Sequence, residues 1–224
     1  MSKIDQNQLT IKLSGMVDSG TMISIDFQSL QGANPKDLGY FVAIWQGTQI
    51  QDLSDAHEIQ NITTEDKDGS VTFKNLELAN LDYIIGFGVD NKEGTSICAT
   101  LDVPKGVKPG EDLNPTLSTV SILRQSSDSL VANFLTPLYN TASTNHNWVA
   151  LFKGNFTANM YKGTNVIVSE KVEESTNEGA VAMDNIPGKL VRFKQYTLVY
   201  GMGLDDSGNP NYSNLISATE FGVA

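Results

Sequence analysis

The sequence contains two closely similar phrases, and this internal repeat constrains the fold more than any other feature. "GYFVAIWQG" occupies residues 39–47, and "HNWVALFKG" occupies residues 146–154. A shift of 107 residues superposes the two phrases and also places Phe27 on Phe134. With a few insertions, three further blocks match in the same order: "GSVTFKNL" with "GAVAMDNI", "YIIGFG" with "YTLVYG", and "ICAT" with "ISAT". Because order and spacing both hold, we interpret the chain as a tandem duplication of a unit of about 100 residues.

The segment between the two copies has the composition of an exposed linker. "PKGVKPGEDLNP", residues 104–115, contains three prolines and two glycines. Proline and glycine interrupt regular structure, and proline stiffens a connecting segment. We therefore expect a first β-sandwich repeat over residues 1–104, a Pro/Gly linker over 105–115 and a second β-sandwich repeat over 116–224.

The local patterns of both copies are those of β-strands. In "TMISIDF", Ile23, Ile25 and Phe27 fall on one face and polar residues fall on the other, which is the two-residue period of a half-buried strand. "FVAIW" and "WVALF" are apolar on both faces, as is typical of a central strand covered on each side. Turn signals such as "KDG", "NKEG" and "DDSGN" separate the runs, of which there are about seven per copy. The sequence therefore predicts an all-β fold with two tandem immunoglobulin-like β-sandwich domains.

Two stretches resemble known families. "FKNLELANLDYIIGFGVDNKEG" resembles the end of a fibronectin type III or other immunoglobulin-like domain, and "NWVALFKG" resembles the tryptophan-led strand of SKICH-type sandwiches. The resemblance implies that Tyr83 and Tyr196 are corner tyrosines, whose hydroxyl groups bond back to an upstream loop. It also implies binding or localisation more than catalysis. The disulfide of antibody domains is absent, since Cys98 is the single cysteine and matches Ser217 in the repeat.

Composition and charge exclude several classes of partner. The formal net charge is −11 and the pI is about 4.5, so we expect nucleic acid and anionic lipid surfaces to repel the chain. No run of eighteen apolar residues is present, and we expect no membrane insertion. The start of the sequence lacks the pattern of a secretory signal. The expected localisation is therefore cytoplasmic, or outside the cell by export without a classical signal peptide.

Residues for catalysis or cofactor binding are scarce. His57 and His146 are the only histidines and do not match in the repeat, so a zinc site would lack ligands. Cys98 lies in the apolar run "SICATL", where a thiol usually behaves as a small hydrophobic side chain. Neither a phosphate-binding glycine loop before a helix nor a G-x-S-x-G nucleophile elbow is present. We therefore predict a protein that is not an enzyme and uses no cofactor.

Two carboxylate-rich turns offer the hard oxygen ligands that calcium prefers. "VDNKEGT" and "LDDSGNPN" follow equivalent strands and contain Asp90, Glu93, Asp205, Asp206 and Asn209. Neither turn fits the twelve-residue EF-hand loop, and hairpin turns select Asp, Asn and Gly for backbone reasons alone. We expect no metal site, and these five residues are the calcium candidates if one exists.

The remaining candidates are aromatic residues in the expected loops of the second copy: Tyr139, Phe156, Tyr161 and Tyr212. Exposed aromatic rings are typical of surfaces that bind proteins or sugars. Our leading hypothesis is a non-catalytic tandem binding module that recognises a protein or a glycan through its end loops. In one alternative, each ring fills its own loop. In another, the protein is a self-associating structural or assembly protein, or a toxin component, that assembles through edge strands.

Overall fold

The computed structural model describes residues 6–90 and 96–223, and these residues form an all-β fold, which confirms the predicted fold class. The helical segments among them are two short 3-10 helices, η1 (Leu53–Asp55) and η2 (Ala158–Lys162). Over the described part of the chain, no helix has the length and apolar character needed to cross a membrane. The residues divide into two compact units, and each unit is described by itself below.

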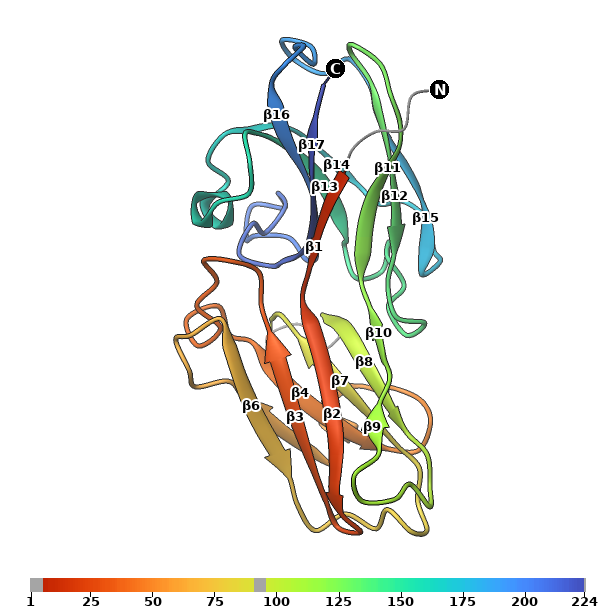
Figure 1. Cartoon of the computed structure of the whole chain (residues 1–224). Helices are drawn as coiled ribbons and strands as arrows, with labels where there is room; N and C mark the ends of the chain where they lie inside the picture. The colour runs from red at the N-terminus through yellow and green to blue at the C-terminus, as the bar shows by residue number, and fades with distance from the viewer. Residues whose placement is uncertain (1–5, 91–95, 224) are drawn as a thin grey trace. The chain divides into compact units, whose positions relative to one another are not determined.

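Unit 2 consists of residues 11–29 and the described residues of 33–117, and it contains two antiparallel sheets. The strands of one sheet lie in the order β6 (Asp68–Phe73), β3 (Met22–Gln28), β2 (Lys12–Ser19) and β9 (Asp112–Leu113). The strands of the other lie in the order β10 (Pro115–Leu117), β8 (Ile97–Val103), β7 (Tyr83–Gly88), β4 (Phe41–Gln46) and β5 (Glu58–Asn61). Figure 1 shows these strands in red to yellow-green.

Unit 1 consists of the described residues 6–10, 30–32 and 118–223, and its strands pair in a similar scheme. One sheet has the order β11 (Thr119–Gln125), β12 (Leu130–Leu135) and β15 (Glu178–Met183). The other has the order β1 (Gln6–Thr10), β17 (Leu215–Gly222), β16 (Gln195–Gly201), β13 (Trp148–Lys153) and β14 (Val166–Lys171). In Figure 1 the red strand β1 therefore lies beside the blue strand β17.

These units differ from the boundaries expected from the sequence in two places. Residues 6–10 lie near the start of the sequence but group with residues 118–223 in unit 1. Residues 112–117, expected to lie mostly in a linker, form β9 and β10, which pair with β2 and β8 of unit 2. The prolines and glycines of this segment indicate turns. They do not indicate that β9 and β10 pair with the free N–H and C=O groups of the edge strands β2 and β8.

The strands β4 and β13 are the central strands that the opening phrases predict, and five of the six residues of each are buried. One face of β4 packs within the sandwich: Val42 pairs with Phe87, whose ring contacts Phe27 at 5.5 Å between centroids. The other face carries Phe41 and Trp45, which form a cluster with Ile50 and the η1 segment. Coverage on each side is therefore confirmed for β4, and on its outer face the cover is the connection that follows the strand.

The large rings at the starts of β4 and β13 are accommodated by glycine on the neighbouring strand. Phe41 pairs with Gly88, and Trp148 pairs with Gly201. A Cβ atom added to either glycine would lie 2.2 Å from an atom of the facing ring. The glycines inside "YIIGFG" and "YTLVYG" thus make room for aromatic side chains in strands where glycine otherwise weakens the sheet.

The strand register corrects one match of the repeat. Cys98 lies at a bulge between β7 and β8, where residues 97 and 99 pair but residue 98 does not. Ile216 lies at the equivalent bulge between β16 and β17. Cys98 therefore corresponds to Ile216 and not to Ser217. The identical letters of "ICAT" and "ISAT" are one residue out of register with the paired strands, and in a strand such a shift exchanges the two faces.

Candidate functional site

The structure buries two of the four predicted aromatic binding residues and partly buries a third. Phe156 and Tyr161 are buried, and their ring centroids lie 6.2 Å apart. Tyr212 is half-buried, with its ring 5.2 Å from that of Trp148 and 5.8 Å from that of Phe152. These positions are those of the alternative in which aromatic residues fill their own loops. Tyr139 exposes 37% of its surface.

The carboxylate turns are held by their own hydrogen bonds. The Oδ1 atom of Asp205 accepts the N–H groups of Ser207 and Asn209, both at 2.9 Å. In the other turn, the Ser96 hydroxyl donates to the Asp90 carbonyl oxygen. Asp206 is exposed, and Glu93 lies outside the described residues. Over residues 6–90 and 96–223, no group of three His, Cys, Asp or Glu side chains is placed to hold a metal ion. The carboxylate of Asp205 thus serves the turn, which is the backbone reason for Asp at such positions.

Cys98, the single cysteine, lies in the core. Its thiol is buried and donates to the Phe87 carbonyl oxygen at 3.5 Å. Burial raises the pKa of this thiol far above its ordinary value, so the reactive thiolate is strongly disfavoured. Both histidines, His57 and His146, are exposed. The buried, hydrogen-bonded Cys98 thiol is therefore a structural side chain of the core.

The corner tyrosines implied by the family resemblance are confirmed. The hydroxyl of Tyr83 accepts the N–H of Glu77 at 3.0 Å, and the hydroxyl of Tyr196 accepts the N–H of Val191 at 2.9 Å. Each bond fixes the segment that enters the apolar strand of its unit. In unit 1 this segment carries the most exposed large apolar side chain among those described.

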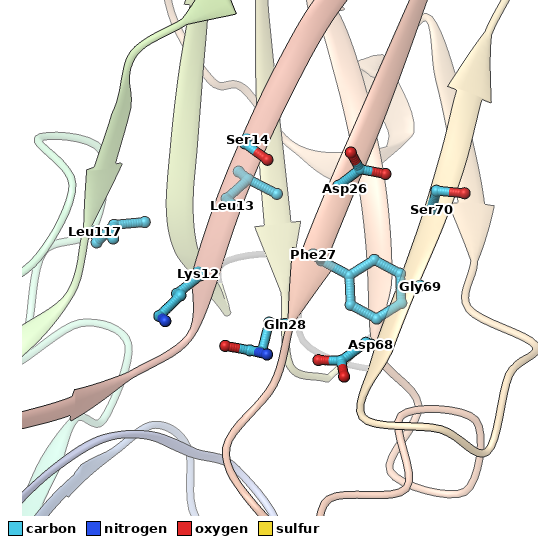
Figure 2. Close-up of a pocket in the computed structure, with 10 residues that line it drawn as sticks. All are labelled: Lys12, Leu13, Ser14, Asp26, Phe27, Gln28, Asp68, Gly69, Ser70 and Leu117. Atoms are coloured by element: carbon cyan, nitrogen blue, oxygen red, sulfur yellow. The ribbon is translucent and has the colours of Figure 1, made fainter.

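Unit 2 has a shallow hollow of about 780 Å³, shown in Figure 2. Lys12, Asp26, Gln28 and Asp68 from β2, β3 and β6 line it, and the ring of Phe27 lies against Gly69. The Lys67 side chain and, to a smaller extent, Gln28 hydrogen-bond to Asp68 and lower the pKa of its carboxyl. The hollow lies on a sheet face and mixes apolar and polar side chains, and no hydrogen bond among the described residues joins its serine hydroxyls, Ser14 and Ser70, to its carboxylates.

The connection from β15 to β16 in unit 1, residues 184–194, is the stronger candidate; we call it the β15–β16 corner. Phe193 exposes 87% of its surface and Val191 exposes 49%. Phe193 also has a left-handed backbone, with φ of 61°. The corner carries Lys189, Arg192 and Lys194 against one acidic residue, Asp184. A bulky residue rarely adopts this backbone conformation, and large apolar side chains are seldom so exposed.

Backbone hydrogen bonds hold this corner in place. The N–H of Phe193 donates to the Val223 carbonyl oxygen at 2.7 Å, and the N–H of Val223 donates to the Lys194 carbonyl oxygen at 3.2 Å. The N–H of Leu190 donates to the Ser127 carbonyl oxygen at 2.6 Å, and Leu190 itself is buried. Together with the Tyr196 hydroxyl, these bonds anchor residues 190–194, so the Phe193 ring projects from a fixed support.

The equivalent connection of unit 2, residues 74–82, lacks these features. Leu78 takes the place of Leu190, since it is buried and its N–H donates to the Gly20 carbonyl oxygen across the corresponding turn. The segment contains no aromatic residue, and it carries one cation and two acidic residues. The exposed ring and the positive charge are therefore additions to one unit and not part of the shared framework.

Phe193 is not among the binding residues that the sequence patterns predicted. The available signal was "GKLVRFK", residues 188–194, in which three cations alternate with apolar residues in a chain of net charge −11. The stretch also contains the extra residues that lengthen this connection relative to "NLELANLD" of the first copy.

Comparisons with known proteins add little at the level of sequence: no protein-family model and no curated protein matches the chain. Among solved structures, the chain is similar to the chicken CNTN1 FN1–FN3 domains, with 11% identity over 96% of this chain and a TM-score of 0.28. It is also similar to the BSP domain of a biofilm-associated protein, with 12% identity over 91% of this chain and a TM-score of 0.28. The chain spans 66% of the first structure and 28% of the second, less than two thirds of either.

Proposed function

We propose that this protein is a non-catalytic binding module that docks a protein partner at the β15–β16 corner of unit 1, with Phe193 as the anchor. The observation that carries the proposal is the 87% exposure of this ring in a left-handed backbone. Such a conformation costs about 1–3 kcal/mol in a residue other than glycine, and an exposed ring contributes no core packing to offset it. We infer that the exposed Phe193 ring contacts a binding partner, and that this contact offsets the cost of its left-handed backbone.

The chemistry of the corner favours a protein over a glycan. Aromatic rings and arginine are enriched among the residues that dominate protein interfaces, and here Arg192 lies next to Phe193 in the sequence. Lys189 and Lys194 add positive charge at the same corner. The fitting partner surface is an apolar pocket with carboxylates at its rim, since opposite charges around a pocket speed association and fix orientation. Because the corner is already held by hydrogen bonds, little ordering entropy opposes docking.

The test compares the full chain with a variant in which the ring is removed. Proteins from cells that make this chain are enriched on the immobilised protein, and each candidate is then purified and titrated against wild type, Phe193→Ser and Leu138→Ser. Leu138 is the matched control, because it exposes 75% of its surface in the β12–β13 connection. We expect Phe193→Ser to weaken binding by at least about tenfold, as the loss of an interface anchor does, and Leu138→Ser to leave it unchanged.

Two results would contradict the proposal. A purified partner that binds wild type and Phe193→Ser equally would show that the corner is not the docking site. If no protein partner is found and glycans of a library bind wild type and Phe193→Ser equally, the result would favour the hypothesis that the end loops bind a glycan.

A further inference from the structure

We propose that the groove between β11 and β17 of unit 1 is a strand-binding site. It binds the chain's own strand β1, and it can bind β1 of a second copy of this chain in its place. The groove is filled by residues 6–10 in the structure. This inference is independent of the β15–β16 corner and of Phe193.

The main chain of β1 is held on one side by β17. The two strands pair antiparallel over five residues, from Gln6 opposite Phe221 to Thr10 opposite Ser217. The Ser217 hydroxyl adds a bond to the Leu9 carbonyl oxygen at 3.1 Å. Main-chain pairing of this kind provides affinity for any extended segment that reaches the edge of a sheet.

The side chains of β1 are held on the other side by β11, and this contact is specific. Gln6 makes two bonds to the Ile122 backbone: its Nε2 donates to the carbonyl oxygen at 3.0 Å, and its Oε1 accepts the N–H at 2.9 Å. Gln8 Nε2 donates to the Val120 carbonyl oxygen at 3.2 Å, and Thr10 Oγ1 donates to that of Ser118 at 2.6 Å. Alternate residues of a strand share one face, so a Gln-x-Gln-x-Thr pattern matches the backbone groups of alternate residues over 118–122.

The chain contains a nearer segment that the groove does not use. Residues 115–117 lie one residue before β11, and the shift of 107 residues places Pro115 on Gln8 and Leu117 on Thr10. Neither residue has a polar side chain to donate, and this segment instead pairs with β8 in unit 2 as strand β10. The groove is therefore filled by the segment that matches its side-chain pattern and not by the one closest to it in sequence.

A second copy is the partner that this pattern fits, because it carries the identical strand. Only Ile11 separates β1 from β2, and β2 belongs to unit 2. In sequence, β1 is therefore next to a strand of unit 2, although it completes a sheet of unit 1. Exchange of an identical element between protomers preserves every contact of that element, and it is a low-cost route to dimers. The chain's own strand has the advantage of high effective concentration, so exchange requires concentrated protein.

The first experiment traps the exchanged pair in full-length protein. A chain carrying Leu9→Cys is mixed with a chain carrying Ala218→Cys, since these residues face each other in the β1–β17 register. The mixture is oxidised at protein concentrations from micromolar to millimolar and run on a non-reducing gel. We expect covalent heterodimers that increase with concentration. The matched control pairs Leu9→Cys with Val166→Cys, an exposed position at the start of β14, and measures random collision.

The second experiment measures the groove directly. A fluorescent peptide of residues 1–11 is titrated into a variant that lacks residues 1–10. We expect saturable binding, and we expect binding to weaken by at least about tenfold when the peptide carries Gln6→Ala and Gln8→Ala. Full-length protein, in which the chain's own β1 competes for the groove, serves as the control and should bind the peptide far less.

Heterodimers no more abundant than in the Val166→Cys control would overturn the exchange between copies. A truncated variant that folds, by circular dichroism, and ignores the peptide would overturn the strand-binding site itself. If the truncated variant does not fold, the cross-linking result in full-length protein decides the matter alone.

Discussion

Single glycines decide whether the large aromatic residues fit. Phe41 and Trp148 start equivalent strands, and each lies over a glycine of the neighbouring strand, Gly88 or Gly201. Both copies of the repeat thus contain the same pair, an aromatic ring opposite a glycine. The sequence shows both members of each pair, but the strand register is needed to bring them opposite each other.

Gly88→Ala is expected to destabilise the protein by about 1–3 kcal/mol or more, because the new methyl group would overlap the Phe41 ring in a packed core. The control is Gly20→Ala, where an added Cβ has no neighbour within 4 Å. Urea denaturation followed by tryptophan emission measures both. Equal free energies of unfolding for the two variants would contradict the ring and glycine arrangement.

At the level of elements, connections between strands contribute side chains to the core of each unit. The segment around η1 covers Phe41 and Trp45, whereas in unit 1 Tyr212, from the β16–β17 connection, contacts Trp148 and Phe152. Phe156 and Tyr161 are buried in the connection after β13, and Tyr212 is half-buried, whereas the sequence pattern predicted exposed rings at all three positions. An aromatic residue in a polar loop has the same local pattern whether it faces a ligand or its own strand, so the sequence could not separate the two cases.

Tyr212→Ala is expected to cost about 1–3 kcal/mol of folding free energy and to shift tryptophan emission to longer wavelength, since it uncovers the Trp148 ring. Phe193→Ala is the control, because that ring is exposed and its removal should change the free energy of unfolding by less than about 0.5 kcal/mol. Emission and urea titration are read from the same samples. An unshifted spectrum for Tyr212→Ala would place its ring away from Trp148.

At the scale of the whole molecule, the order of residues along the chain differs from their grouping in space. Residues 6–10 complete a sheet of unit 1, and residues 112–117 complete the sheets of unit 2. Both segments pair with edge strands, which otherwise present free N–H and C=O groups to other chains. The useful boundaries for expression are therefore set by strand pairing and not by the Pro/Gly composition of residues 104–115.

A fragment of residues 11–117 is expected to unfold at a higher temperature than a fragment of residues 1–104. The longer C-terminal end retains β9 and β10, whereas the other fragment leaves one edge of β2 and of β8 unpaired. Thermal unfolding by circular dichroism, with light scattering to detect association through the free edges, compares the two. A fragment 1–104 that is equally stable and monomeric would contradict the assignment of β9 and β10 to unit 2.

Local sequence patterns were enough to predict the all-β class, the alternating strand "TMISIDF" and the buried central strands. These features follow from local periodicity, which a single sequence records. The corner roles of Tyr83 and Tyr196 were implied by the resemblance to immunoglobulin-like domains, and the hydrogen bonds of the structure confirm them. The tertiary structure alone decided the partner of β1, the register that places Cys98 on Ile216, and the exposure of Phe193. Each of these depends on which distant strand supplies a hydrogen-bonding edge or a packing surface, and such non-local pairings leave no periodic trace along the chain.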